Sequence, residues 1–161
     1  MGKIIGKFFV EDNPGLIEKL KLLGAGTMEG EVLKLPLLEA AYFQRREAIS
    51  TGKTAEELIE LAKEEDVLAK ERFAVLKELR NSGYIVRIGE GDSEFLRVYK
   101  KGIRVGEDRT ESVLKVLKEG KKPDLLLDLV EAARMRKSLY YAFIFNDGKI
   151  VFVKAYRAGF D

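Results

Sequence analysis

The fold is decided by one stretch of this sequence, Lys77-Glu-Leu-Arg-Asn-Ser-Gly-Tyr-Ile-Val86, and by the segment Phe95-Leu-Arg-Val-Tyr99 that follows it. Apolar residues at helical spacing run up to Asn81-Ser82-Gly83, a group typical of a helix end. The residues from Tyr84 onward and the segment 95–99 are then typical of strands separated by a glycine-bearing turn. A helix that passes directly into strands predicts a chain of mixed α/β (α+β) class.

Downstream of this stretch the pattern continues with strands and one helix. Ser112 to Leu117 is predicted as a strand, although its apolar spacing also fits a helix. Pro123-Asp124 begins a helix that runs through Ala133. Leu139 to Phe145 and Lys149 to Tyr156 form a hairpin across Asn146-Asp147-Gly148, and the apolar run within it is typical of a buried strand.

Upstream, the first half of the chain predicts a separate small α/β unit. It begins with a strand over Lys3 to Val10 and a helix that carries Leu16 to Leu23, followed by an extended stretch near Glu31 to Leu35. Helices follow from Pro36 and from Thr54, where Thr54-Ala-Glu-Glu57 has the form of a capping box. The charged run at residues 63–66 then separates the two halves, so we expect domains at 1–65 and 66–161.

Composition excludes several classes of function. The chain has no cysteine and no histidine, which leaves neither disulfides nor the usual ligands of a transition metal, and we expect no cofactor. Its net charge is only +2, so an RNA site must be local. No apolar run approaches the ~20 residues of a membrane span, and we expect a soluble, cytoplasmic protein. The charge-rich balance is often met in thermophile proteins.

Three stretches together resemble the archaeal tRNA-intron endonuclease family. They are Leu33-Lys-Leu-Pro-Leu-Leu-Glu-Ala-Ala-Tyr42, the stretch 77–99 already quoted, and Glu131-Ala-Ala-Arg-Met-Arg-Lys137. The resemblance implies a small N-terminal α/β domain and a C-terminal nuclease-like domain with a mixed central sheet flanked by helices. It also implies metal-independent RNA cleavage that leaves a 2′,3′-cyclic phosphate and a 5′-hydroxyl.

The resemblance assigns three catalytic positions, one of which is altered here. Tyr99 matches the tyrosine that activates the ribose 2′-hydroxyl, and Lys137 matches the lysine that stabilises the charged phosphorane. The histidine that protonates the leaving 5′-oxygen is expected where this chain has Arg109. Because an arginine with a pKa above ~12 is a poor proton donor, no intact catalytic set is expected.

The resemblance also implies partners. The family includes heterotetramers built from two catalytic and two structural subunits, and in these assemblies an acidic turn of one subunit docks into a basic pocket of another. Asp147 lies on the matching turn, and Phe145, Val151 and Val153 belong to the hairpin expected to pair across the dimer. Arg134 and Arg136 are the candidate RNA-binding residues, and precursor tRNA and a histidine-bearing catalytic subunit are the expected partners.

Ordinary structural roles also fit these residues. Tyrosine is common in strands, and cations near a helix C-terminus interact favourably with the helix dipole. Aspartate is favoured in hairpin turns. A weaker alternative places Mg²⁺ between Asp108 and Glu119.

Three hypotheses follow for the function. The first is a structural subunit of a heterotetrameric tRNA-splicing endonuclease, which is not catalytic by itself. The second is a self-sufficient endonuclease that uses Arg109 or water as the acid. The third is a protein-interaction module that has no role with RNA.

Overall fold

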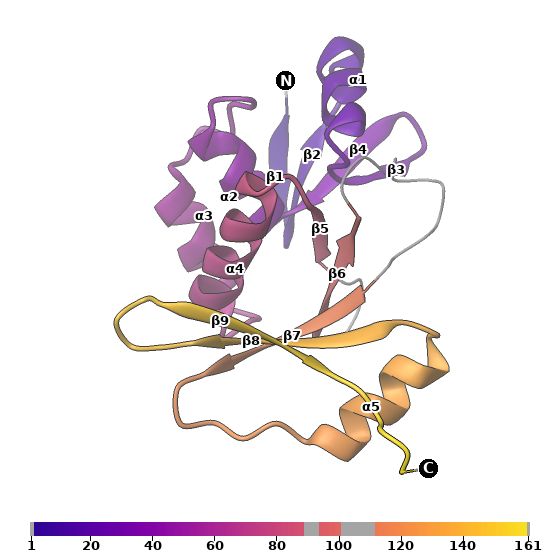
Figure 1. Ribbon diagram of the computed structural model, residues 1–161. Helices are drawn as coiled ribbons and strands as arrows, with labels where there is room; N and C mark the ends of the chain where they lie inside the picture. Colours follow the sequence, from indigo (N-terminus) through magenta and orange to yellow (C-terminus); the bar gives the residue numbers. More distant parts are fainter. Residues whose placement is uncertain (1, 89–93, 101–111, 161) are drawn as a thin grey trace.

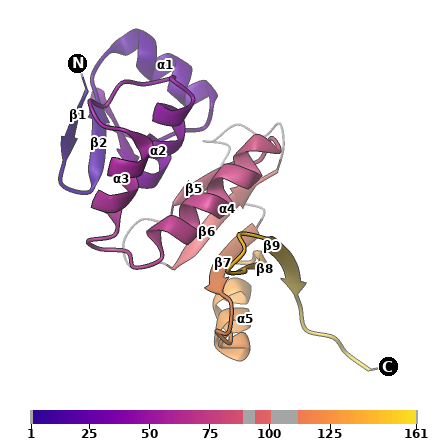
Figure 2. The ribbon, with the colours of Figure 1, turned by 90° about the vertical axis from the view of Figure 1, so that its left-hand side faces the viewer.

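The computed structural model describes residues 2–88, 94–100 and 112–160 of the chain. Within these ranges the chain forms two β-sheets with helices packed against them, which confirms the predicted α+β class. The N-terminal sheet and the C-terminal strands β7 to β9 lie at opposite ends of the molecule, and so do the first and last described residues (Figure 1, Figure 2).

The N-terminal half is an antiparallel sheet of order β1-β2-β4-β3 with three helices. Its elements are β1 (Lys3–Ile5), β2 (Phe8–Glu11), α1 (Pro14–Leu22), β3 (Thr27–Glu29), β4 (Val32–Pro36), α2 (Leu37–Arg45) and α3 (Ala55–Ala62). The predicted capping box is confirmed, because Thr54 Oγ1 accepts from the Glu57 amide at 3.1 Å and Glu57 Oε1 accepts from the Thr54 amide at 3.0 Å.

The single strand predicted over Lys3 to Val10 is wrong. The stretch is a hairpin in which Ile5 pairs with Phe8, and Gly6 takes a left-handed φ of +60° that lets the chain reverse. The short strand β3 was not predicted either, since all of its residues are exposed and no apolar alternation marks it.

The C-terminal half is a mixed sheet of order β5-β6-β7-β8-β9, in which only the β7–β8 pair is parallel. Its elements are α4 (Ala69–Asn81), β5 (Ile85–Ile88), β6 (Phe95–Tyr99), β7 (Ser112–Lys118), α5 (Leu125–Arg134), β8 (Ser138–Ile144) and β9 (Ile150–Ala155). Residues 112–118 form a strand, so the helical alternative is wrong.

Helices α4 and α5 flank this sheet on opposite faces (Figure 1). Leu114, Val116 and Ala142 belong to the large core that includes α4, whereas Val113, Leu139 and Tyr141 form a smaller core with Ala132 of α5. Neighbouring residues along a strand point to opposite faces, so the two clusters identify which face each side chain occupies. Tyr141 and Ala142 are buried, as predicted for this run.

A buried charge cluster joins the two halves of the chain. Glu39 of α2 is fully buried, and its Oε1 accepts from the Gly26 amide at 3.0 Å. The Arg87 Nε atom of β5 lies 3.4 Å from Glu39 Oε2 without hydrogen-bond geometry, so this contact is electrostatic. Arg80 of α4 donates to the carbonyls of Leu23, Gly24 and Val86 at 2.6 to 3.2 Å. The predicted domain boundary near residue 65 stays a prediction.

Candidate functional site

The register of the C-terminal sheet brings Tyr99 and Lys137 to the same edge. Val98 of β6 pairs with Ser112 of β7, and Ser112 pairs with Ser138 of β8. Tyr99 follows Val98, and Lys137 precedes Ser138. Because β6 runs antiparallel to β7 and β8 runs parallel to it, both residues lie one position beyond this row at the same end of the strands. Two strand spacings of about 4.8 Å therefore place their backbones roughly 10 Å apart.

The two residues also share a face of the sheet. Tyr99 follows Phe95 by four residues, and Lys137 precedes Leu139 by two residues. An even spacing along a strand places side chains on the same face. Phe95 and Leu139 both belong to the small core under α5. Tyr99 is 7% exposed and Lys137 is half-buried. A phenol and an ammonium at this spacing can contact one phosphodiester group or two neighbouring ones.

Lys137 is held by the C-terminal end of α5. The amides of Lys137 and Arg136 donate to the carbonyls of Ala132 and Ala133 at 2.9 and 3.0 Å, which is the Schellman pattern. Arg136 occupies the position that this motif usually gives to glycine, at a φ of +57°. A side chain there costs backbone energy, because Cβ crowds the carbonyl in the left-handed region.

The other candidate cations differ in their surroundings. Arg134 and Arg136 are both exposed, and Arg134 lies 3.3 Å from Glu131 one helical turn back. Arg109 falls outside the described residues, so its relation to Tyr99 and Lys137 stays a prediction.

A polar network beneath α5 was missed from the sequence. Asp128 is 2% exposed; its Oδ2 accepts from the Tyr141 hydroxyl at 2.7 Å, and its Oδ1 lies 3.2 Å from Lys115 Nζ. Lys115 also reaches Glu94 at 3.1 Å. The network ties α5 to β7 and β8, so it positions the helix whose C-terminal end holds Arg136 and Lys137. The only sequence signal was an acidic residue on the inner face of an apolar helix.

The network shifts the pKa values of Tyr141 and Lys115. Burial, followed by the hydrogen bond and negative charge of Asp128, raises the pKa of Tyr141 well above its usual range. Partial burial by itself would lower the pKa of Lys115, but hydrogen bonds to Glu94 and Asp128 outweigh it and raise that pKa. Both residues therefore keep their protons at neutral pH.

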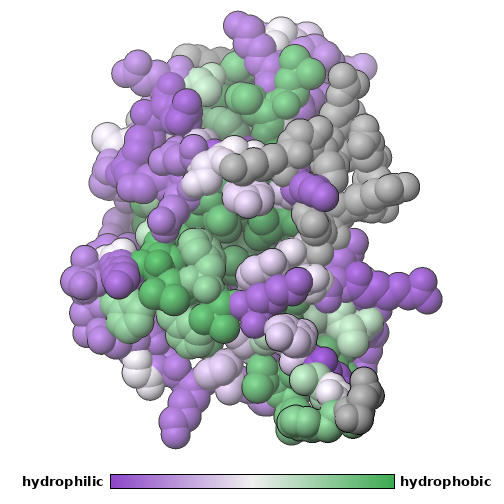
Figure 3. Space-filling model, in the orientation of Figure 1, coloured by the Kyte–Doolittle hydropathy of each residue, from purple (hydrophilic) through white to green (hydrophobic). Residues whose placement is uncertain are grey.

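The β8–β9 hairpin presents an exposed apolar edge. β9 is the last strand of the sheet, and Phe145, Val151 and Val153 are 37%, 36% and 41% exposed. Hydrophobic residues gather over this hairpin on the face that Figure 3 shows. An edge strand with free backbone groups and apolar side chains can accept a partner strand.

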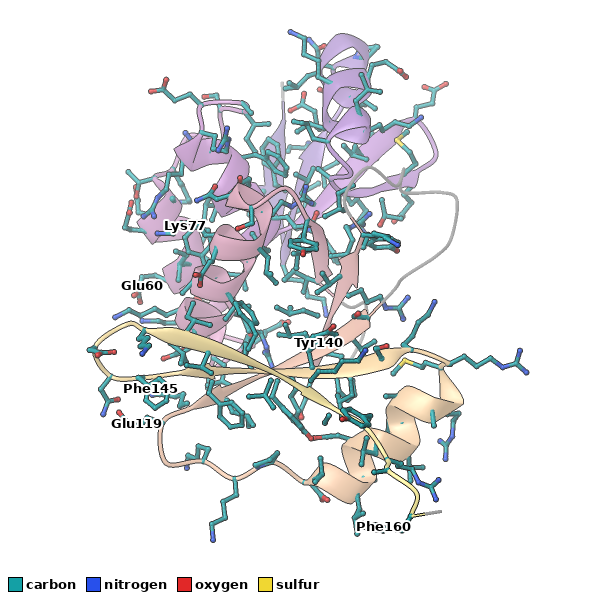
Figure 4. The ribbon with its side chains drawn as sticks, viewed as in Figure 1. Glu60, Lys77, Glu119, Tyr140, Phe145 and Phe160 are labelled. Carbon is teal, nitrogen blue, oxygen red and sulfur yellow. The ribbon has the colours of Figure 1, made fainter. Side chains whose placement is uncertain are left out.

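Asp147 lies in the turn of this hairpin and is exposed. One of its oxygens, Oδ1, accepts from the Lys149 amide at 2.9 Å. The turn borders a hollow of about 460 Å³, where the side chains of Glu119 and Phe145 lie at the tip of the hairpin (Figure 4). Glu119 Oε2 accepts from the Asn146 amide at 3.1 Å, so the turn is held in place.

A groove of about 680 Å³ lies between α1, α2 and α4. Lys21 and Arg46 are exposed cations on its wall, and Arg46 stacks on Tyr42 with 5.7 Å between the guanidinium carbon and the ring centre. Arg80 also lines the groove, but its two terminal guanidinium nitrogens donate to backbone carbonyls. The Tyr42 hydroxyl donates to Asn81 at 3.0 Å, which fixes the ring under Arg46.

Two absences hold for the described residues. No group of three or more acidic side chains in the ranges 2–88, 94–100 and 112–160 is arranged to hold a metal ion. Asp108, one half of the Mg²⁺ alternative, lies outside those ranges. In the same part of the chain no helix has the length and apolar character needed to cross a bilayer.

The chain is similar to known RNA-processing proteins. Residues 69–152 match the family model described as tRNA intron endonuclease, catalytic C-terminal domain, and this range includes Tyr99, Lys137 and Asp147. The chain is 32% identical over 135 residues to a tRNA-splicing endonuclease of Thermococcus gammatolerans, which covers 79% of this chain and 78% of the relative. Its identity to the tRNA-splicing endonuclease of Pyrococcus abyssi is 31% over 139 residues, covering 81% and 79%.

Proposed function

Since this chain belongs to the tRNA intron endonuclease family, we propose that it serves as a non-catalytic subunit that completes a tRNA-splicing endonuclease with a histidine-bearing chain of the same family. The relatives carry the name tRNA-splicing endonuclease, and the proposal extends removal of introns from precursor tRNA to the complex that contains this chain. The single observation that carries the non-catalytic role is the complete lack of histidine in 161 residues.

The missing histidine removes the proton donor that cleavage of the RNA backbone needs. Attack of the ribose 2′-hydroxyl on phosphorus expels a 5′-oxygen, which must gain a proton as it leaves. A general acid works best when its pKa lies near the working pH. The cations near the sheet edge are arginine and lysine, whose ordinary pKa values of above 12 and about 10.4 make them slow donors at neutral pH. Lys137 can still neutralise phosphate charge.

Two surfaces support assembly with a partner. The exposed edge of β9, with Phe145, Val151 and Val153, suits strand pairing across a dimer. The acidic turn at Asp147 and the groove lined by Lys21 and Arg46 have opposite charges, so each suits the matching surface of another family subunit. The exposed Arg134 and Arg136 leave the end of α5 open to RNA phosphates.

Cleavage of an intron-bearing precursor tRNA in EDTA tests this function. We would assay this chain by itself, a histidine-bearing family chain from the same genome by itself, and the two mixed. The proposal expects cleavage from the mixture and none from this chain. Cleavage by this chain without a partner would favour the second candidate, in which Tyr99 and Lys137 at the same sheet edge work with Arg109 or water. No effect of this chain in any mixture would favour an interaction module without a role with RNA.

A matched pair of variants tests the assembly surface separately. Val153→Lys places a charge on the exposed edge of β9, whereas Val67→Lys places the same charge at a valine that is 89% exposed and far along the chain from that edge. Size-exclusion chromatography of the mixed chains should show that only Val153→Lys weakens the complex. Equal behaviour of the two variants would remove the β9 edge from the proposed interface.

A further inference from the structure

Beside Tyr99 on strand β6 lies a cation that neither the family match nor the resemblance assigns. Arg97 is exposed in the middle of β6, two residues before Tyr99, so both side chains are on the same face of the sheet. Across the neighbouring strands Arg97 stands in one row with Val113 and Leu139. Lys137 precedes Leu139 by two residues and therefore lies on the same face.

Arg97 also stands directly opposite a second arginine. Its register partner on β5 is Arg87, and side chains of directly paired antiparallel residues are neighbours on one face. Arg87 is compensated by Glu39 and donates to Thr27 Oγ1 at 2.7 Å. Like charges placed opposite each other are destabilising, so an anion bound at Arg97 would relieve this repulsion.

Some of the cations near this face form ion pairs with carboxylates, and others do not. Lys115 is held by Glu94 and Asp128, and Arg134 is held by Glu131. In the described part of the chain no carboxylate lies within ion-pair distance of Arg97, Arg136 or Lys137. We call Arg97 and Lys137, the two of these residues that share this face, the open cation strip.

We propose that the open cation strip binds phosphodiester groups of RNA, with Arg97 as the residue that grips a phosphate. This inference rests on the proposed function, since it names a contact between this subunit and the RNA that the complex cleaves. A guanidinium presents a planar fork of donors that matches two phosphate oxygens, and no described carboxylate competes for the fork of Arg97. The strip holds RNA and carries out no chemistry, because the chain has no histidine to protonate the leaving oxygen.

A phosphate contact makes a specific prediction about salt. Removal of one phosphate contact to single-stranded or duplex nucleic acid lowers the slope of log K against log salt by about 0.7–0.9. Phosphates carry no sequence information, so the effect should be similar for RNAs of one shape and different sequence. Because Arg97 is exposed and lies outside both core clusters, its replacement should leave the fold intact.

The experiment measures binding of a labelled, intron-bearing precursor tRNA to the mixed complex between about 50 and 200 mM KCl, a range over which phosphate contacts change affinity strongly. Arg97→Ala should weaken binding about tenfold at the lowest salt and reduce the slope by about 0.7–0.9. Arg97→Lys keeps the charge, so the slope of log K against log salt should be unchanged. Because lysine lacks the planar fork of donors, this variant should bind the RNA more weakly than the unmodified complex. Lys70→Ala, at an exposed lysine of α4, is the matched control and should change neither quantity.

Three results would overturn the inference. An unchanged slope for Arg97→Ala in a complex that still assembles and cleaves would show that Arg97 does not contact RNA, and the proposed function would stand. Failure of that variant to assemble would show that the strip binds carboxylates of a protein partner. A decrease in affinity for Arg97→Ala that depends on the RNA sequence would exclude a phosphate contact. Absence of cleavage from the unmodified mixture, in contrast, contradicts the proposed function itself.

Discussion

Replacement of Asp128 by alanine should destabilise the fold far more than an average surface substitution. The carboxylate is 2% exposed and accepts from the Tyr141 hydroxyl at 2.7 Å, while Lys115 lies 3.2 Å away. Without it the buried hydroxyl of Tyr141 has no acceptor, which costs about 1–3 kcal/mol. Lys115 keeps Glu94, so the broken ion pair adds only about 0.2–1 kcal/mol. We expect a decrease near ~2.5 kcal/mol in the free energy of unfolding, or a Tm lower by about 5–10 °C.

A double-mutant cycle with Tyr141→Phe shows whether the network is the cause. Tyr141→Phe removes the hydroxyl and leaves Asp128 with Lys115, so it should cost about 1 kcal/mol. In the double variant no hydroxyl is left without an acceptor, and the total cost should fall below the sum of the single costs by about 1 kcal/mol or more. Urea unfolding followed by circular dichroism measures each free energy. Costs that add within about 0.5 kcal/mol would refute the reasoning.

Three further predictions concern backbone strain, pH and chemistry. Arg136→Gly should raise the free energy of unfolding by about 0.5–1 kcal/mol, because glycine tolerates the φ of +57°, and a lower urea midpoint would show that the arginine side chain stabilises the helix end. The pKa values of Tyr141 and Lys115 are raised above their ordinary 10.0 and 10.5, so the folded chain holds protons that the unfolded chain releases. The stabilisation that comes from these two shifts is therefore fully present below about pH 10 and is lost as pH rises further. Tyr141→Phe should flatten that alkaline decrease in Tm in a series of thermal melts. In the mixed complex at saturating RNA, Tyr99→Phe or Lys137→Ala should leave the cleavage rate nearly unchanged, and a large decrease in an assembled complex would assign chemistry to this subunit.

Local patterns in the sequence determined most elements and the character of the site. The capping box at Thr54, the helix end at Ser82 and the turn at Asp147 each depend on residues within a few positions of one another, so they can be recognised without a fold. The absence of histidine is likewise a property of the sequence, and it carries the proposal of a non-catalytic subunit. The missed reversal at Gly6 shows the limit of this approach, because a single glycine within an apolar run does not reveal its backbone angle.

Only the tertiary structure decided which of these elements meet. Apolar periodicity shows which face of a strand is buried, but it does not specify the partner strand or its register. The parallel pairing of β7 with β8 placed Tyr99 and Lys137 at one edge, although 38 positions separate them in the chain. Tertiary packing also brought Asp128 to Tyr141, strand pairing placed Arg97 opposite Arg87, and no carboxylate in the described part of the chain lies within ion-pair distance of Arg97. The paired residues are separated by 10 positions or more (97 − 87 = 10), beyond the reach of one helical turn or one tight turn, so their energies are absent from any local pattern.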